Sequence, residues 1–581
     1  MSPSPSPCLR PRPGRPVRLA LIATALAALA GGLAAGAARA DELAGVKDAR
    51  VRKGAEVVLE VRAKMKAMHV DGARFTDADY YASAVRTLAR TLEAPDSRIA
   101  LSSGDRDALL AFARARPPED GSFGPLFAEM DRRLAGRRMD DVWVVSDALA
   151  RGVIETVGDP FTHYFDQKAM WRIASQLFGG KPKSFGFKAV REEGAYRVGF
   201  VYHGYDAAAK GVAQGDIIVE VDGVPTAALS EAEVLAATSG QRESEVRLRL
   251  YRPGWARAHE VTLAATAPAG PNVESALLPG GIGYVRLDTF LFQAGGQVGR
   301  AVERLEAQGM KALVFDVRDN PGGAVISCIE ICDLFLGEGE LITRTESRGG
   351  LLGDQTYRAK EAGTRPRYPM AILVNGSSAS ASEMFAGALK DNGRALLVGQ
   401  TTYGKGVGQG PVLLDSAFGE RFLLLTQMTY YTPRGTTPQR VGIEPDVAVS
   451  GPTADPKDAE AIFALRAGGV FRRYVDGRLA ADRATLFVLA NDDGGDCARW
   501  PGFDALHASV ETAAAGAGLA VAPSREAVRR ELRRELRRAI AESDRRVAVP
   551  PDLRDDPQLR RAHEVALERL RAPRERAARL F

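Results

Sequence analysis

The sequence is organised around the stretch Val374-Asn375-Gly376-Ser377-Ser378-Ala379-Ser380-Ala381-Ser382-Glu383. This stretch follows an apolar segment typical of a buried strand and leads into apolar residues with helical spacing. A hydroxyl group here lies at the start of a helix, beside the free amide groups of the first turn. Downstream, Lys405 stands between two glycines, which permit close backbone approach. The two segments together predict a serine nucleophile, Ser380, with Lys405 as its base.

Two simpler interpretations compete with this one. Ser380 and Glu383 have the spacing of a capping box, in which the two side chains satisfy backbone amides at a helix start. Lys405 on its own is typical of a solvated loop lysine. The neighbouring serines that rival Ser380 as the nucleophile are Ser377, Ser378 and Ser382.

The order of these segments resembles that of the carboxyl-terminal processing peptidases, also called tail-specific proteases. The resemblance is carried by the serine-rich turn, by Ala386-Gly387-Ala388-Leu389-Lys390-Asp391-Asn392 and by Tyr403-Gly404-Lys405-Gly406. That family uses a Ser-Lys dyad with a glutamine beside the lysine. The resemblance therefore implies that Ser380, Lys405 and Gln409 are the catalytic residues.

An apolar strand at residues 312–317 precedes the turn Arg318-Asp319-Asn320-Pro321-Gly322-Gly323. Such strands are typical of sheets that are buried on both faces. By resemblance, one glycine amide of this turn, that of Gly322 or of Gly323, joins the amide of Ala381 in an oxyanion hole. The resemblance also implies an α/β serine protease core of the crotonase/ClpP-like type.

Residues 180–266 read as short β-segments separated by turns, and their Gly215-Asp216-Ile217-Ile218 run resembles PDZ domains. Such a module adds an extended C-terminal peptide to the edge of a sheet and holds its carboxylate with backbone amides. The resemblance places this peptide site at Phe185, Gly186 and Phe187. The alternative is a small β-domain that serves only for packing.

The first 40 residues have the features of an export signal. Basic residues precede an apolar run, and Ala38-Arg39-Ala40 matches a small-residue cleavage site. A membrane span is the weaker interpretation, because a span needs about 20 apolar residues. Five of the 78 basic residues lie in this leader, so the mature chain carries 73 residues of each sign. We expect a periplasmic protein that does not bind nucleic acid, since the basic footprint for such binding is missing.

The predicted organisation has five parts: a signal peptide at 1–40, a helical N-terminal region at 41–179, the PDZ domain at 180–266, the protease core at 267–450, and a helical C-terminal region at 451–581. The fold class is multidomain α/β. A helix from Ser524 has an apolar stripe that is typical of a solvated surface helix, with dimerisation as the alternative. Cys328 and Cys332 are expected to be buried free thiols rather than a bridge.

Taken together, these features predict a periplasmic serine endopeptidase that recognises C-terminal tails through its PDZ domain. The sequence lacks a His-Glu-x-x-His zinc motif and a phosphate-binding loop, so no metal or cofactor is expected. The expected partners are protein substrates with apolar C-terminal tails, and the sequence leaves open an adaptor or activator protein and a homo-oligomer. The alternative function is a non-catalytic scaffold of the cell envelope that binds such tails.

Overall fold

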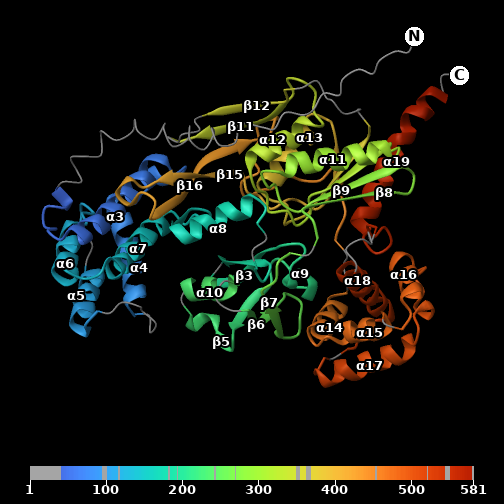
Figure 1. Cartoon of the computed structure of the whole chain (residues 1–581), viewed down its shortest axis with the longest axis horizontal. Coiled ribbons are helices and arrows are strands. Elements are labelled where there is room, and N and C mark those ends of the chain that lie inside the picture. Colours follow the sequence, from blue (N-terminus) through green and yellow to red (C-terminus); the bar gives the residue numbers. More distant parts are fainter. Residues whose placement is uncertain are drawn as a thin grey trace, which may run out of the picture. The chain divides into compact units, whose positions relative to one another are not determined.

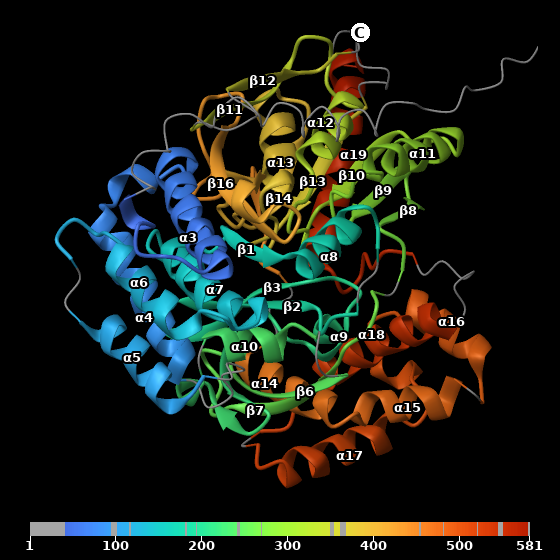
Figure 2. The same ribbon diagram turned by 60° about the vertical axis from the view of Figure 1, so that its left-hand side comes forward.

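The computed structural model describes residues 41–578, except 94–100, 116–117, 181–182, 193, 230, 241–243, 269, 349–353, 361–367, 452–454, 480, 520 and 544–549. The expected export signal at 1–40 lies outside the described residues. No helix within the described part is long and apolar enough to cross a membrane. The chain divides into two compact units, which are described separately (Figures 1 and 2).

The first unit contains the N-terminal helices together with residues 409–428. Its helices are α3 (Ala49–Met68), α4 (Asp77–Glu93), α5 (Ser103–Arg114), α6 (Gly124–Leu134) and α7 (Met139–Glu155). The apolar stripes of these helices share one core. The short strand β1 (His163–Asp166) pairs in antiparallel register with β16 (Arg421–Tyr431), and β15 (Val407–Leu413) also pairs with β16. The helical N-terminal region is thus closed by a strand and a hairpin.

The second unit is built on a six-stranded sheet of order β17-β14-β13-β10-β9-β8. All neighbours are parallel except β8 and β9. The strands are β8 (Val273–Leu278), β9 (Ile282–Leu287), β10 (Ala312–Asp316), β13 (Met370–Val374), β14 (Leu396–Gly399) and β17 (Val447–Ala448). An antiparallel pair of strands, β11 (Leu341–Ser347) and β12 (Gln355–Arg358), follows helix α12 (Val325–Asp333) in the sequence.

Helices cover both faces of this sheet because successive strand residues point to opposite sides. Leu313 and Phe315 of β10 pack with α11 (Ala294–Ala307), α12 (Val325–Asp333) and α13 (Ala381–Asp391). Ala312 and Val314 face the C-terminal helix α19 (Pro557–Ala578). Both views show α19 alongside these strands (Figures 1 and 2). The sheet is therefore a buried layer whose strand ends carry the loops of the candidate site.

A second sheet, of order β2-β3-β4-β6-β7, forms the module predicted at 180–266. Its strands are β2 (Phe187–Glu192), β3 (Ala195–Val201), β4 (Ile217–Val221), β6 (Glu245–Tyr251) and β7 (His259–Ala264), with β5 (Val224–Pro225) beside β4. Two helices, α9 (Asp206–Lys210) and α10 (Glu231–Thr238), complete the module, and α8 (Gln167–Leu177) precedes it. Within the described residues, β2 is an edge strand of this sheet.

The C-terminal helices form a bundle of their own. They are α14 (Pro456–Ala467), α15 (Val470–Leu479), α16 (Arg483–Asn491), α17 (Phe503–Gly516) and α18 (Arg525–Ser543). The stripe on α18 was expected to belong to a solvated surface helix, and this expectation is wrong: Val528, Leu532 and Leu536 are fully buried in the bundle. Apolar residues at the spacing of one helix face show that a face is covered, but they do not show by what.

The three cysteines of the described chain are free, as expected for Cys328 and Cys332, which are buried. The Cys328 thiol donates to the carbonyl oxygen of Ala381, with the two atoms 3.3 Å apart. This cysteine therefore packs directly under the start of α13.

Candidate active site

The predicted nucleophile lies between β13 and α13, as the sequence indicated. β13 ends at Val374, and α13 begins at Ala381, immediately after Ser380. The backbone of Ser380 has φ 58° and ψ −116°, a conformation that side-chain-bearing residues rarely adopt. Such strain persists only where the surrounding contacts hold the residue in place. The contacts of Ser380 are therefore informative about function.

Glu383 supplies the most important of these contacts. Its Oε2 atom accepts hydrogen bonds from the backbone amides of Ser380 and Lys405, each at 2.8 Å. Its Oε1 atom accepts from the Thr402 hydroxyl at 2.6 Å and from the Gly404 amide at 2.7 Å. Four donors directed at two oxygens correspond to a carboxylate. The Oε2 atom of Glu383 thus binds the backbone amides of both the predicted nucleophile and the predicted base.

The Glu383 side chain is fully buried, and burial raises the pKa of its carboxyl above the ordinary value, against the effect of its four hydrogen bonds. The glutamate half of the predicted capping box is present, because this side chain accepts from the Ser380 amide. The Glu383 amide donates to the Ser380 carbonyl oxygen at 2.9 Å. The Glu383 side chain therefore caps the start of α13 and also binds the Lys405 amide.

Tyr430 makes a second link between the same two residues. Its hydroxyl oxygen lies 3.0 Å from the carbonyl oxygen of Ser380 and 2.8 Å from that of Lys405. The ring is buried among the core side chains, and burial, followed by the nearby Glu383 charge, raises the pKa of the phenol well above its ordinary value. The hydroxyl is therefore a neutral donor at physiological pH. Glu383 and Tyr430 together fix the amide and carbonyl groups of both residues.

The three rival serines all have protein acceptors for their hydroxyl protons. Ser377 donates to Gln214 Oε1, Ser378 to the Val317 carbonyl and Ser382 to the Asn320 carbonyl, at 2.8, 2.8 and 2.9 Å. The acceptor of Ser382 belongs to the turn that follows β10, and the acceptor of Ser378 immediately precedes that turn. These two hydroxyls therefore bind the nucleophile loop to that turn.

The turn after β10 lies directly against Ser380. A Cβ atom placed on Gly322 would lie 2.8 Å from the Ser380 Cβ and 2.9 Å from the Ala381 nitrogen, so only glycine fits there without a shift. The Gly322 amide itself donates to Asn320 Oδ1 at 2.9 Å. Among the hydrogen bonds of the described chain, none uses the Gly323 amide. The Gly322 amide is thus already engaged within the turn, whereas the Gly323 amide is available to a bound group.

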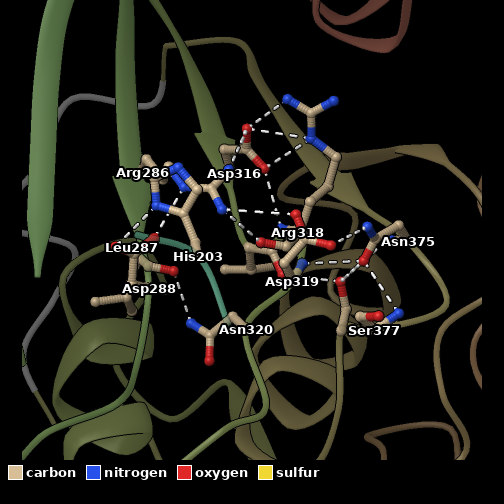
Figure 3. A network of polar contacts seen from close by, with 12 residues as sticks. His203, Arg286, Leu287, Asp288, Asp316, Arg318, Asp319, Asn320, Asn375 and Ser377 are labelled. Carbon is tan, nitrogen blue, oxygen red and sulfur yellow. Dashed lines mark hydrogen bonds and ion pairs between the residues drawn. The ribbon is translucent and has the colours of Figure 1, made fainter. Parts of the chain in front are cut away.

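A buried ionic network surrounds the start of this turn (Figure 3). Arg318 donates to Asp316, with the closest pair of atoms 2.7 Å apart, and the Arg286 guanidinium donates to the Arg318 carbonyl oxygen at 3.1 Å. Burial opposes ionisation of Asp316, but the Arg318 and Arg286 charges outweigh it and lower the pKa of its carboxyl to about 2. Asp319, with φ 59°, exchanges two hydrogen bonds with Asn375. The turn is thus anchored on both sides.

Gln409, the third predicted catalytic residue, belongs to the first unit. Its Nε2 atom donates to the Thr426 hydroxyl at 3.0 Å. The Thr426 amide donates in turn to the Thr162 hydroxyl at 3.1 Å, and Thr162 donates to Asp159 at 2.6 Å. The segment Asp159-Pro160-Phe161-Thr162 therefore supports the strand that faces Gln409. The structure does not place Gln409 relative to Ser380.

Of the three predicted peptide-binding residues, Phe187 begins edge strand β2, and Phe185 and Gly186 immediately precede it. The side chains of Phe185 and Phe187 are buried in the module core, so they anchor the segment and present its backbone. Gly186 has φ 90°, and a Cβ atom there would lie 2.0 Å from the Tyr205 Cβ. Its amide donates to the Ser184 hydroxyl at 3.1 Å.

A cavity of about 690 Å³ lies between the β2–β7 module and the core. Its lining includes His203 and Gln214 of the module together with Asp319, Asn375 and Ser377 of the core. The module contacts the core here through the Ser377–Gln214 hydrogen bond and through His203, whose Nδ1 lies 3.3 Å from Asp288 Oδ2. Figure 3 shows that Asn375 and Ser377 belong to the same network as the turn after β10.

Sequence reasoning missed several residues of this site. Glu383 was considered only as a helix cap, and Tyr430 and Arg286 were assigned no role. Glu383 could have been found from its position three residues after the predicted nucleophile, in a segment otherwise free of charge. Tyr430 gives no local signal, because its partners are 25 and 50 residues away.

Comparison with known proteins shows which families the chain resembles. The model of peptidase family S41 matches residues 281–449, and the PDZ domain model matches residues 175–250. The chain is 32% identical over 332 residues to the chloroplastic C-terminal processing peptidase of Tetradesmus obliquus, a match that covers 54% of this chain and 69% of that protein. It is 34% identical over 253 residues to the carboxyl-terminal-processing protease of a Synechocystis strain, covering 43% of this chain and 58% of the relative.

Among solved structures, the photosystem II D1 C-terminal processing protease matches with 27% identity and a TM-score of 0.45. That match covers 60% of this chain and 94% of the solved chain. The two family models end at residues 449 and 250, before the C-terminal helices begin at Pro456.

Proposed function

Because the chain belongs to the carboxyl-terminal processing peptidases of family S41, we propose that it is a serine endopeptidase with Ser380 as nucleophile and Lys405 as base. The observation that carries this proposal is the shared oxygen of Glu383, which receives the amides of both residues. This single atom orders Ser380 and Lys405, which lie 25 positions apart in the sequence, as expected if the two residues act together.

The chemistry requires a neutral lysine. The ordinary lysine pKa of about 10.4 leaves the amine protonated at neutral pH, so it must fall by about 3 units for Lys405 to accept the serine proton. Partial burial of the loop and the positive end of α13 favour the neutral amine, whereas the Glu383 carboxylate opposes it. Desolvation must therefore outweigh Glu383. Gln409, four residues further on, is proposed to orient the amine.

With Lys405 neutral, Ser380 attacks the peptide carbonyl and transfers its proton to the amine, which then protonates the leaving nitrogen. The amides of Gly323 and Ala381 are proposed to stabilise the oxyanion. Gly322, packed against Ser380, permits this close approach. A preorganised donor of this kind typically contributes about 100- to 1,000-fold to the rate. The crotonase/ClpP-like class of the core remains part of this proposal.

We further propose that the PDZ domain selects substrates by their free C-terminal tails. Edge strand β2 can receive an extended peptide as a further strand, and the segment around Gly186 would hold the terminal carboxylate. The buried rings of Phe185 and Phe187 keep this segment rigid. We expect the bound tails to be apolar. A scaffold that binds tails without cleaving them has no need of the link between Ser380 and Lys405.

Amidation of the substrate tail tests this recognition. For an unfolded reporter with an apolar C-terminus, we expect amidation of that C-terminus to raise KM about tenfold or more and to leave kcat unchanged. Hydrogen bonds to a charged group are typically worth about 1.5–3 kcal/mol, and about 1.4 kcal/mol corresponds to tenfold in affinity. Mass spectrometry of the cleavage products gives both constants. Equal KM values for the free and the amidated tail would rule out recognition of the carboxylate.

The contacts between the PDZ domain and the core suggest that the domain also restrains the site. We expect Gln214→Ala, which removes the acceptor of Ser377, to raise kcat/KM on short peptides without an apolar tail by about two- to tenfold. A neutral hydrogen bond has a net value of about 0.5–1.5 kcal/mol, which sets this range. Gln214→Glu keeps an acceptor and serves as the control. If both variants match the parent, this contact does not gate the enzyme.

Export to the periplasm, an adaptor or activator protein and a homo-oligomer are part of the proposal. The leader is tested by the N-terminal mass of protein recovered from the cell envelope, for which we expect a chain that begins at Asp41. An intact Met1 would contradict cleavage of the leader.

A further inference from the structure

Arg318, the first residue of the turn after β10, is held by carboxylates from two distant parts of the chain. Its guanidinium donates to Asp316, two residues earlier, and also to Asp556, 238 residues later. The second contact is bidentate, with Nη1–Oδ1 and Nη2–Oδ2 distances of 3.0 and 2.8 Å. Gln558 Oε1 also accepts from Nη1, at 3.1 Å. Planar, two-point contacts of this kind fix both the position and the direction of a guanidinium.

The turn that Arg318 begins is interlocked with the nucleophile. The carbonyl oxygens of Val317 and Asn320 accept from the hydroxyls of Ser378 and Ser382, and the Ala379 amide also donates to Asn320, at 3.0 Å. Asp319, next to Arg318, has a strained positive φ of 59°. A displacement of Arg318 would therefore displace the glycine turn as well.

Asp556 is itself firmly placed. Its Oδ1 accepts from the Leu559 amide at 2.9 Å, so it caps α19, whose residues Leu559 and Ala562 are buried against the sheet. The residues just before it are also fixed: Asp552 and Asp555 each bind the fully buried guanidinium of Arg533 on α18, at 2.7 Å. The acidic segment 552–556 thus joins the C-terminal bundle to the turn after β10.

We propose that Asp556 is a positioning residue for the oxyanion hole: it holds Arg318, and through Arg318 the glycine turn, in the geometry that oxyanion stabilisation requires. The inference rests on the proposed peptidase function. Asp556 lies more than 100 residues beyond the segment that the peptidase model matches, 281–449, so the role belongs to the C-terminal region. Asp556 does not touch substrate and acts only through Arg318.

The variant Asp556→Ser separates this role from helix capping. Serine is as good an N-cap as aspartate, but its side chain is too short to reach Arg318. We expect kcat to fall at least tenfold while KM stays within twofold, because a displaced oxyanion donor weakens the transition state and leaves tail binding unchanged. Asp556→Asn, which keeps the size and the cap but loses the charge, is expected to fall between the parent and Asp556→Ser.

Leu559→Ala is the matched control, since it loosens the packing of α19 without touching Arg318. We expect it to lower the melting temperature and to keep kcat within twofold. A loss of kcat in Leu559→Ala equal to that in Asp556→Ser would assign the effect to the packing of α19 and overturn the inference. An unchanged kcat in Asp556→Ser would overturn it as well.

Hydrogen exchange provides a measurement that does not depend on activity. We expect the backbone amides of residues 317–324 to exchange at least tenfold faster in Asp556→Ser than in the parent, with no such change in Leu559→Ala. If the parent proves inactive on every reporter, the proposed function fails, and the exchange rates still decide whether Asp556 holds the turn. Equal exchange in parent and Asp556→Ser would contradict the inference.

Discussion

Replacing Lys405 with methionine is expected to lower kcat/KM by about 100- to 10,000-fold. Methionine has a similar length but no amine, so the serine proton loses its acceptor, and general-base catalysis typically contributes about this factor. Lys390→Met is the matched control, because Lys390 is on α13 and its amine donates to the Glu444 carbonyl at 2.7 Å. That variant should retain full activity. A Lys405→Met protein with more than a tenth of the parent activity would exclude the lysine base.

The role of Lys405 as the base also determines how kcat/KM depends on pH. Below the pKa of Lys405 the amine is protonated and cannot accept a proton, so kcat/KM must fall as the pH is lowered through that pKa. We expect kcat/KM to rise with pH along an ascending limb that reports deprotonation of the lysine base. A profile that is flat between pH 6 and 9 would contradict a base of this kind.

Glu383→Ala is expected to reduce kcat at least 100-fold and to destabilise the protein by several kcal/mol. The change leaves four buried donors without their acceptor, and each buried unsatisfied group typically costs about 1–3 kcal/mol. Among these donors are the amides of Ser380 and Lys405, whose alignment would be lost together. Activity on the reporter and thermal unfolding measure the two effects.

Glu60→Ala is a matched control for this loss of stability. Glu60 is equally buried, and its carboxylate accepts from the amides of Asp415 and Ser416 within the N-terminal unit. We expect Glu60→Ala to unfold more easily while keeping most of its kcat. If Glu383→Ala loses stability without losing kcat beyond the Glu60→Ala level, Glu383 is a structural cap only.

Glu383→Gln provides a finer test. The amide can keep its oxygen towards Ser380 and Lys405 and turn its NH2 group towards Thr402, whose hydroxyl can accept a hydrogen bond, and towards Gly404, whose amide cannot. We therefore expect this variant to retain more activity than Glu383→Ala. Equal losses in the two variants would show that the negative charge, rather than the hydrogen bonds, is needed.

The local sequence pattern was sufficient to predict most of the secondary structure of the protease core. The buried strand predicted before the serine-rich stretch is β13, an apolar run followed by a turn, and the β-segments predicted at 180–266 include β6, which alternates buried and exposed residues. The placement of Ser380 directly before a helix also follows from local pattern, since small residues there precede apolar residues at helical spacing.

The remaining features depend on contacts between distant segments, which a single sequence does not display. The apolar stripe of α18 indicated one covered face, but its burial also depends on ion pairs such as Arg529–Asp493, 36 residues apart. The grouping of residues 409–428 with the N-terminal helices depends on contacts such as that of Glu60 with Ser416. Asp556 has no local feature that distinguishes it from its acidic neighbours. Its significance comes from the position of Arg318.

The most direct test of the central claim is a mass-spectrometric time course of an unfolded reporter with an apolar C-terminal tail. The reporter is incubated with residues 41–581 and with Ser380→Ala of the same chain. Ser509→Ala, which changes a serine on α17, is purified in the same way as a control. The nucleophilic role of Ser380 predicts internal cleavage by the parent and by Ser509→Ala, and none by Ser380→Ala. Cleavage of the same bonds at the parent rate by Ser380→Ala would contradict it.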